Sequence, residues 1–475
     1  MKTNSVLWTF LIAVTCTLAP CFSQTLKPHP VPDEFESDQY TVQINGIPVQ
    51  VFQASPRVHF VSFDFTGTAE IKVDGKTVRE KGVPLPIRKD QEHGSSVWKG
   101  DAVIRPSSRN IKVASSGTKA TFTLGKPGQY ILEGSDEAQA DIDNKNMALF
   151  VFANNPEADR PEENDAKVIY LKAGIHQENI DLESGQTLYL EAGAVLFGSI
   201  DVYDAKDVKI LGRGVVYHNG PQSENHDNGY WRKRNWHPLT TRNVEGLTVS
   251  GITFVARSRT WTIQMHTTFD ADFDNVKVFG INDQNINGDG FDWVAGGGRT
   301  TITNSLIRSA DDAFAIFTPR GPEPEGIVKD IRIDNCVIWP TRANVFRAHG
   351  YTDGFVLQNS DIIHVPETLF NVPRALMYSI NEMPRQATLS NLRFENLRFE
   401  EPAALLGLDF EGGQFNSIVF KDITMQGEAS PMYMNTSIDG VLFDNVTLNG
   451  KKILSEKDLS FEVLTNDIKD LKFSE

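Results

Sequence analysis

Hydrophobic and polar residues alternate along most of the chain, in short runs that turn residues separate. Between residues 38 and 154 these runs recur at intervals of about ten residues, and this pattern predicts an antiparallel β-sandwich. The strands that we expect there are Tyr40–Ile44, Val58–Phe65, Ala69–Val73, Ala120–Leu124, Tyr130–Leu132 and Ala148–Phe152.

A repeated phrase follows in the second part of the chain. Each copy places two or three alternating apolar residues before a polar bend, often Asn or Asp, and two more after it. Copies roughly 22 to 37 residues apart fit the coils of a right-handed parallel β-helix, in which stacked coils bury a common core. A β-propeller is the alternative, but its blades have a longer period and antiparallel strands. The copies lie at 244–254, 271–278, 328–338, 352–363, 389–399, 415–425 and 438–448.

The N-terminus has the pattern of a secretory signal peptide. Lys2 precedes an apolar run from Val6 to Ala19, and small residues precede Gln24 at the positions that signal peptidase reads. The run is too short to span a membrane, and Pro20 disfavours lipidation of the cysteine that follows it. We therefore expect a signal peptide at 1–23 and a secreted or periplasmic protein without a membrane span.

The remaining chain divides near residue 160. Residues 154–164 are polar and contain proline, as linkers often do. We predict a β-sandwich domain with linker at 24–160 and a parallel β-helix catalytic domain at 161–475. Because a solenoid of this kind needs no partner to close its core, we expect a monomer.

Composition narrows the range of functions. The chain has 475 residues, more than one ordinary domain contains, and 46 Lys and Arg against 62 Asp and Glu give a net charge of −16. This balance argues against nucleic acid as a partner, since phosphate recognition needs a basic surface. Cleavage of the signal would leave Cys336 as the one cysteine, so an internal disulfide is impossible, and its apolar setting predicts burial.

Acidic residues gather in two consecutive predicted coils. Asp289 and Asp311 are 22 residues apart, close to one coil, and we expect them to stack on one face. Asp312 follows directly and Asp292 is a fourth carboxylate nearby. Two such charges about 4.8 Å apart repel by roughly 3.5 kcal/mol at an effective dielectric of 20, which raises the pKa of one carboxyl. Glycoside hydrolysis uses this arrangement, because one acid must stay protonated while another activates water.

Two other interpretations of these residues exist. Asn-Gly and Asp-Gly are also common turn signals, and a single motif of this kind would be ambiguous. Residues 283–288 begin like a calcium-binding EF-hand loop, but Val294 stands where a bidentate Glu is needed. We therefore favour a catalytic cluster with no metal or other cofactor.

The motif residues resemble a known clan of enzymes. The segment 287–292, Asn-Gly-Asp-Gly-Phe-Asp, followed by Asp311 and Asp312, resembles the signature of the polygalacturonases, glycoside hydrolase family 28. The segment 258–261, Ser-Arg-Thr-Trp, is similar to a coil of that family just upstream. The N-terminal half and the stretch 337–346 resemble family 49, the dextranases and isopullulanases, which place a β-sandwich before the β-helix.

The resemblance implies an inverting glycoside hydrolase with three catalytic aspartates. It implies Asp311 as the general acid, and Asp289 and Asp312 as residues that share the role of base. The Arg-x-Lys pair with which family 28 grips a galacturonate carboxylate is missing after residue 350. A polysaccharide substrate of the neutral α-glucan type is therefore favoured over galacturonan.

Several further residues are candidates for substrate binding. His349 either tunes the acid or has a structural role, and Arg347 either binds substrate or neutralises the carboxylates. Aromatic rings can stack on sugars or pack in the core, which leaves Trp293 and Trp339 open to both interpretations. The loop 219–243 is too aromatic for a linker, and we predict that it forms a wall of the cleft. The complete set of predicted substrate-binding residues is Asn287, Asp292, His349, Arg347, Trp261, Trp231, Trp236 and Tyr378.

Two functions from other classes compete with hydrolysis. A β-helical polysaccharide lyase would need calcium and a Lys or Arg base, and would release an unsaturated product. A non-catalytic glycan-binding β-helix would keep the aromatic residues but has no use for three crowded acids. Hydrolysis is favoured because acid–base chemistry accounts for the carboxylates.

Overall fold

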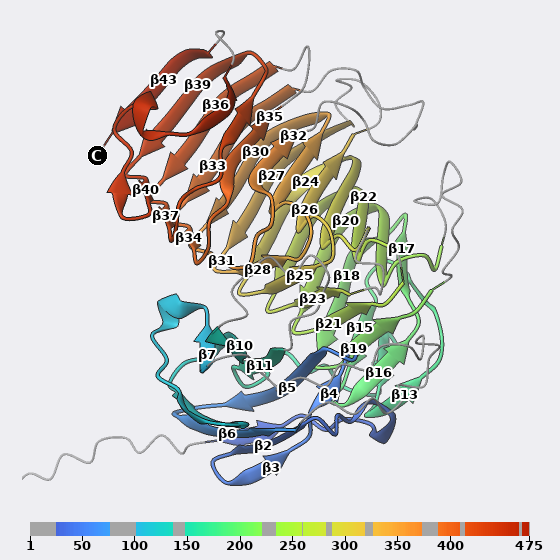
Figure 1. The fold of residues 1–475 in the computed structure, drawn as a ribbon. Helices are drawn as coiled ribbons and strands as arrows, with labels where there is room; N and C mark the ends of the chain where they lie inside the picture. Colours follow the sequence, from blue (N-terminus) through green and yellow to red (C-terminus); the bar gives the residue numbers. More distant parts are fainter. Residues whose placement is uncertain are drawn as a thin grey trace, which may run out of the picture.

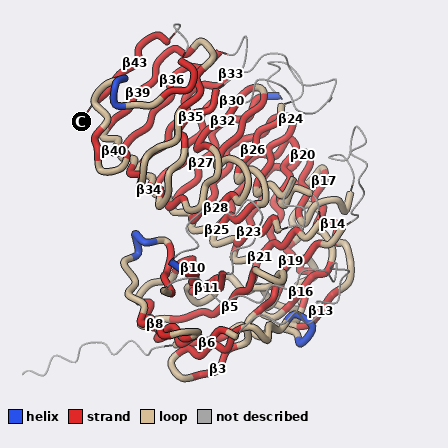
Figure 2. The backbone as a smooth tube through the Cα atoms, in the orientation of Figure 1, coloured by secondary structure: helices blue, strands red, loops and turns tan. Residues whose placement is uncertain are grey.

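The computed structural model describes residues 25–76, 101–135, 148–220, 234–258, 260–281, 287–318, 326–372, 388–408, 414–464 and 468–474. The predicted signal peptide lies outside these residues. A long stack of strands runs beside a smaller group of strands from the N-terminal part of the chain (Figure 1). Strands and loops make up almost all of the described chain (Figure 2), and its helices are the short 3₁₀ turns Asp33–Phe35, Ser107–Arg109 and Glu456–Asp458.

The N-terminal strands form two sheets within the described residues. One has the order β1-β5-β11-β10-β7 with β4 beside β5, and the other has the order β3-β2-β6-β9-β8. The strands are Leu26–Pro28 (β1), Tyr40–Ile44 (β2), Ile47–Val49 (β3), Phe52–Gln53 (β4), Val58–Phe65 (β5), Ala69–Gly75 (β6), Ala102–Arg105 (β7), Ala114–Ser116 (β8), Lys119–Leu124 (β9), Gly128–Gly134 (β10) and Ala148–Asn154 (β11).

All six strands expected in this region are present. The expectation of purely antiparallel pairing is wrong for one pair, because β11 runs parallel to β5, with Ala148 opposite Val58. The chain between these two strands passes through the other sheet and back, which allows them to run in the same direction. Alternate residues of both sheets, such as Ile71 of β6 and Phe63 of β5, bury one shared hydrophobic core.

Two long parallel sheets follow, as the repeated phrase predicted. The larger sheet contains Val168–Leu171 (β12), Ile180–Leu182 (β14), Thr187–Leu190 (β15), Ile200–Tyr203 (β17), Lys206–Gly212 (β18), Leu239–Ser250 (β20), Ile263–Asp274 (β22), Phe291–Thr303 (β24), Phe314–Phe317 (β26), Ile327–Asp334 (β27), Phe346–His349 (β29), Tyr351–Gln358 (β30), Thr368–Val372 (β32), Thr388–Glu395 (β33), Ala404–Leu408 (β35), Gln414–Lys421 (β36), Met432–Met434 (β38), Ile438–Asp444 (β39), Phe461–Leu464 (β42) and Ile468–Ser474 (β43).

The smaller parallel sheet takes one strand from each coil. Its strands are Gly174–His176 (β13), Ala194–Phe197 (β16), Val215–His218 (β19), Thr253–Ala256 (β21), Lys277–Gly280 (β23), Leu306–Ser309 (β25), Val337–Pro340 (β28), Asp361–Ile362 (β31), Arg398–Phe399 (β34), Thr424–Met425 (β37), Thr447–Leu448 (β40) and Lys451–Lys452 (β41), the last of which pairs antiparallel to β40.

The polar bend of the repeat is the corner between the two sheets. Asn335, Asn396 and Asn445 occupy this corner in successive parts of the stack, and each has a positive φ near 50°. Asparagine tolerates this left-handed conformation better than most residues do. Their side chains also form ladders between coils, for example from Asn396 Nδ2 to Asn359 Oδ1 at 2.7 Å. The sequence therefore specifies the corner by backbone conformation and by side-chain hydrogen bonds.

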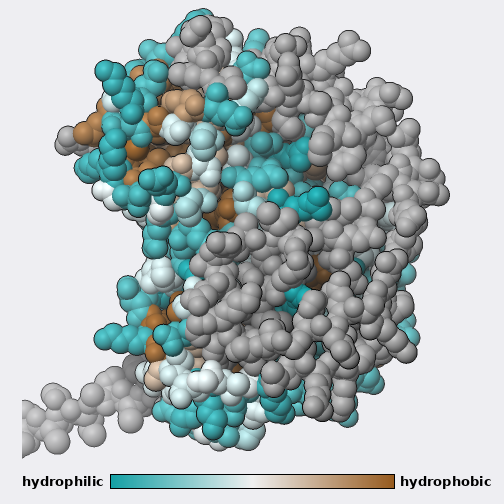
Figure 3. Space-filling model, viewed as in Figure 1, coloured by the Kyte–Doolittle hydropathy of each residue, from teal (hydrophilic) through white to brown (hydrophobic). Residues whose placement is uncertain are grey.

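Apolar residues of equivalent positions stack along the inside of the coils. Phe394, Phe420 and Phe443 occupy one such row, with ring centroids 5.3 and 5.1 Å apart. Cys336 is fully buried in the same core, which confirms the prediction of burial. Among the described residues, no helix has the length and apolar character that a membrane span requires. On the surface shown in Figure 3, hydrophilic residues predominate and hydrophobic ones are scattered.

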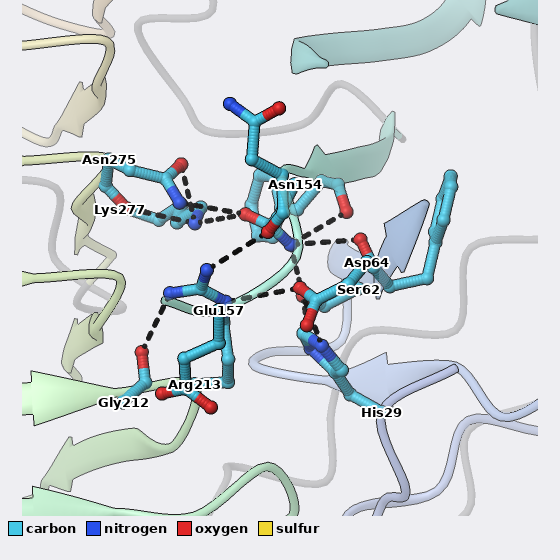
Figure 4. Close-up of polar contacts among 12 residues, drawn as sticks. His29, Ser62, Asp64, Asn154, Glu157, Gly212, Arg213, Asn275 and Lys277 are labelled. Carbon is cyan, nitrogen blue, oxygen red and sulfur yellow. Dashed lines mark hydrogen bonds and ion pairs between the residues drawn. The ribbon is translucent and has the colours of Figure 1, made fainter. Parts of the chain in front are cut away.

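The N-terminal sheets pack directly against the smaller parallel sheet. Phe150 of β11 meets Phe279 of β23 edge to face, with ring centroids 5.0 Å apart. Buried polar contacts flank this apolar interface (Figure 4). Arg213 Nε donates to Asp64 Oδ1 at 3.1 Å, and Lys277 Nζ donates to Asn154 Oδ1 at 2.8 Å. The two parts of the chain therefore share one continuous buried interface.

Candidate active site

The four carboxylates lie at or just before the first residues of two neighbouring strands. Asp292 belongs to β24, and its neighbours Phe291 and Trp293 are fully buried in the core of the coils. Because successive side chains of a strand point to opposite faces, Asp292 faces outward from the stack. Asp289 precedes β24, and Asp311 and Asp312 precede β26 in the same way.

The register differs by one residue from the expected one. Phe291 pairs with Phe314, an offset of 23 residues, and Gly290 N donates to Asp312 O at 3.0 Å. This pairing puts Asp312, rather than Asp311, level with Asp289. The sequence interval of 22 was close to one coil, but the coil here is one residue longer.

Gly290 allows the two coils to approach at this point. A Cβ atom on this residue would collide with the carbonyl oxygen of Ala313 and lie 2.7 Å from Cγ2 of Ile307. Any side chain would therefore push apart the two strands that carry the carboxylates. The Asp-Gly step of the motif has a packing role in addition to its place beside Asp289.

Asp312 is held by several hydrogen-bond donors. Its Oδ1 accepts hydrogen bonds from the backbone N of Asn344 at 3.0 Å and from Asn344 Nδ2 at 2.8 Å, and its Oδ2 accepts one from Arg347 Nη1 at 3.4 Å. Thr368 Oγ1 donates to Asn344 Oδ1 at 2.7 Å and so orients that amide. Donors and a positive charge at these positions stabilise a carboxylate anion.

Asp311 has a different environment. Its Oδ2 accepts a hydrogen bond from the backbone N of Asn287 at 2.9 Å. Burial and, second, the negative charge of Asp312 raise the pKa of Asp311 to about 6. Its residue is partly exposed, whereas Asp289, Asp292 and Asp312 are buried. Asp311 is thus both accessible and able to hold a proton in mildly acidic solution.

Asp289 and Asp292 lie side by side in the interior of the cluster. Burial raises the pKa of both well above the ordinary range, and the charges of the neighbouring carboxylates act in the same direction. Neither oxygen of Asp292 accepts a hydrogen bond from an amide, hydroxyl or cationic group of the described residues. At least one of these two carboxyl groups therefore carries a proton at neutral pH.

Arg347 and His349 complete the polar side of the site. Arg347 Nε donates to His349 Nε2 at 2.9 Å, so this ring nitrogen is an acceptor. Burial and the neighbouring guanidinium hold the pKa of His349 well below its usual value, and its ring is neutral. Arg347 is therefore engaged with Asp312 and His349 together, as its predicted place near the carboxylates requires.

Aromatic side chains form a stack beside the carboxylates. Trp261 is parallel to Phe317 with centroids 5.1 Å apart, and Phe317 stacks on His349 at 5.3 Å. His237 lies parallel to Trp261 on a preceding coil. Trp261 keeps 7% of its surface exposed, which leaves an edge rather than a face of the ring for a ligand.

Other aromatic candidates are distributed differently. Trp293 and Trp339 are fully buried, in the β-helix core and against the N-terminal sheets respectively, so sugar stacking is excluded for them and core packing holds. Trp236 is half-buried, and its carbonyl oxygen accepts a hydrogen bond from Thr260. The predicted residues Trp231 and Tyr378 lie outside the described residues.

Three residues near the site were not singled out from the sequence. Asn344 lies in the stretch that resembles family 49, but its contact with Asp312 depends on the fold. Glu367 is half-buried near Asp312, and burial followed by the charge of Asp312 raises its pKa. Gln264 lies one coil before Asp292, in register with it. Only the alignment of coils reveals that these side chains gather around the carboxylates.

Comparisons with known proteins bear on the fold. No protein-family model matches the chain, and no curated protein matches it by sequence. Among solved structures it is similar to Dex49A from Penicillium minioluteum, with 13% identity and a TM-score of 0.59 over 94% of this chain and 95% of that one. It is also similar to a family 28 exopolygalacturonase from Yersinia enterocolitica, with 12% identity and a TM-score of 0.45 over 95% and 93% of the two chains. An α-1,3-glucanase of family 87 from Streptomyces thermodiastaticus has 12% identity and a TM-score of 0.44, with 95% and 86% covered. The predicted relationship to the polygalacturonase and dextranase group of glycoside hydrolases is confirmed at the level of the fold.

Proposed function

We propose that this protein is a glycoside hydrolase that cleaves a polysaccharide with inversion at the anomeric carbon. The observation that carries the proposal is the unequal treatment of neighbouring carboxylates. Asp312 accepts hydrogen bonds from Asn344 and Arg347, while Asp311 has a pKa of about 6 and no cationic hydrogen-bond donor in the described chain. Pairs of acids whose environments push their pKa values apart are typical of general acid–base catalysis.

The proposed roles follow from these environments. Asp311 donates its proton to the glycosidic oxygen as the bond to the anomeric carbon breaks. Asp312 removes a proton from the water that attacks the opposite face of the sugar, and the product therefore has the inverted configuration. Asp289, which burial and nearby charges favour in the protonated form, shares this role by hydrogen bonding to the water. Together the three residues keep the assignment that the motif implies.

A neutral polymer of the α-glucan type is the proposed substrate class. A uronate would bring its own negative charge next to four carboxyl groups. The cation of the site, Arg347, is already paired with Asp312 and His349. The same pairing disfavours a lyase mechanism, in which a free Lys or Arg would act as the base.

The domain division and export remain part of the proposal. We infer a β-sandwich domain at 24–160 and a catalytic β-helix at 161–475, since the two N-terminal sheets share one core. The apolar segment at 1–23 supports secretion, and the closed core of the solenoid supports a monomer.

The test of the proposed function is sugar release from dextran, pullulan, polygalacturonate and galactan by the purified protein and by Asp311→Asn. We expect one neutral polymer to be cleaved, and the variant to lose roughly 10²- to 10⁴-fold in rate because the general acid is missing. Asp272→Asn is the matched control, since this exposed aspartate of β22 lies outside the site. Equal turnover by wild type and Asp311→Asn would overturn the assignment.

A further inference from the structure

A row of polar side chains continues from the carboxylate cluster toward the N-terminal coils. Thr240 of β20 is in register with Gln264 of β22, and Gln264 is in register with Asp292 of β24. Asp201 of β17 is in register with Thr240 and extends the row by one more coil. These positions alternate with core residues, so all four side chains project from the same outer face, with about 4.8 Å between coils.

The middle of this row is buried without protein partners. Gln264 is fully buried and Thr240 is 2% exposed. Among the described residues, nothing hydrogen-bonds to Oε1 or Nε2 of Gln264, or to Oγ1 of Thr240. A carboxamide carries two N–H donors and an acceptor oxygen, and buried polar groups of this kind almost always have partners.

Stability alone does not account for Gln264. An apolar side chain of similar volume at this position would avoid the penalty of burying unpaired polar atoms. The position also lies one coil from Asp292, beside the proposed catalytic residues. A group that is unfavourable for folding and adjacent to an active site is expected to serve a ligand.

We propose that Gln264 determines substrate specificity by hydrogen-bonding the hydroxyl groups of an uncharged sugar bound next to the catalytic carboxylates. This inference rests on the proposed glycoside hydrolase function and adds the residue that reads the sugar on the N-terminal side of the cluster. A carboxamide donates to one hydroxyl and accepts from another, which matches the vicinal hydroxyls of a pyranose.

The charges around Gln264 identify the class of sugar. Asp292 flanks it on one side, and Asp201 lies two coils away on the other. Arg234, a cation near Asp201, forms an ion pair with Asp181. A uronate carboxylate at this place would face acidic groups without a free guanidinium, whereas a neutral hexose meets no such repulsion.

The test compares Gln264→Leu with the wild-type enzyme on the neutral polymer that it cleaves. We expect kcat/KM to fall by about 10- to 100-fold, which is the range for losing one or two hydrogen bonds to substrate. Calorimetric titration of the corresponding oligosaccharide into Asp311→Asn, with and without Gln264→Leu, should show weaker binding by a similar factor. The Tm of Gln264→Leu should equal or exceed that of the wild type, because no protein hydrogen bond is lost.

A matched control is Gln358→Leu in β30. Gln358 Nε2 donates to Asp334 Oδ2 at 2.7 Å, so this variant should lower Tm and leave kcat/KM unchanged. The same pattern in Gln264→Leu, a lower Tm with unchanged binding and kinetics, would overturn the inference. Preferred cleavage of polygalacturonate by the wild type would overturn its neutral-sugar part. If the wild type cleaves nothing, the proposed function fails, and absence of binding in the titrations would then remove the role of Gln264 as well.

Discussion

Arg347 Nε donates a hydrogen bond to His349 Nε2 at 2.9 Å, and this contact defines the role of the histidine. The nitrogen that accepts from a guanidinium carries no proton, so His349 is not a proton donor in this state. Phe317 stacks on its ring at 5.3 Å and fixes its orientation. We interpret His349 as a positioning residue that holds Arg347 on Asp312.

The first prediction concerns His349. His349→Ala should lower kcat about 10-fold with little change in KM, because Arg347 loses the partner that orients it. His349→Gln can supply an acceptor oxygen, and it should restore much of the activity. Steady-state kinetics of both variants test this. Equal loss in both would indicate that the imidazole itself reacts.

The second prediction is a pH–rate profile. Burial and the charge of Asp312 raise the pKa of Asp311 to about 6, and the general acid must be protonated to act. Activity should therefore decline as pH rises through about 6. The measurement is kcat/KM from pH 4 to about pH 9. An alkaline limb that begins above about pH 8 would contradict the role of Asp311 as the acid.

The third prediction concerns stability and pH. Asp292 has a pKa well above its unfolded value, so the folded state binds its proton more tightly. Its contribution to stability is complete below the unfolded pKa near 4 and is lost as pH rises toward the folded pKa. Asp292→Asn removes this loss and should raise Tm more at pH 8 than at pH 5. Calorimetry at the two pH values checks this, and a variant less stable at pH 8 would refute it.

The sequence contained much of this fold. The polar bends of the repeated phrase are the observed corners, and the apolar residues on either side form both parallel sheets. Strand parity also places Trp293 in the core, because it shares the face of Phe291 while Asp292 takes the other. The stacking interpretation of Trp293 overlooked this alternation.

The remaining features depend on distances along the chain that a pattern does not encode. The parallel pairing of β5 with β11 joins segments more than 80 residues apart, with Val58 opposite Ala148. The contact of Asn344 with Asp312 spans 32 residues and requires the register of adjacent coils. The carboxylates themselves could be predicted, because their crowding is visible in two short motifs.

The fourth prediction tests the buried interface between the N-terminal sheets and the β-helix. Asp64 accepts from Arg213 Nε and contacts His29 Nε2, both at 3.1 Å, and all three side chains are largely buried. Asp64→Ala leaves Arg213 without this partner and should lower the free energy of unfolding by about 3 kcal/mol. Denaturant unfolding measures the change.

The control for this prediction is an exposed ion pair in the same part of the chain. Glu70 contacts Lys72 at 2.6 Å with both side chains about half exposed. Glu70→Ala should change the free energy of unfolding by less than about 1 kcal/mol. Similar effects of Glu70→Ala and Asp64→Ala would show that the buried contacts contribute no more than surface pairs do.

The central claim is that Asp311 and Asp312 act as acid and base in an inverting hydrolysis. Proton NMR of the anomeric region during the first minutes of polymer cleavage tests it most directly. For an α-linked substrate, the account predicts that the β-anomer of the new reducing end appears first and then mutarotates. First appearance of the α-anomer, or growth of an unsaturated sugar signal, would contradict it.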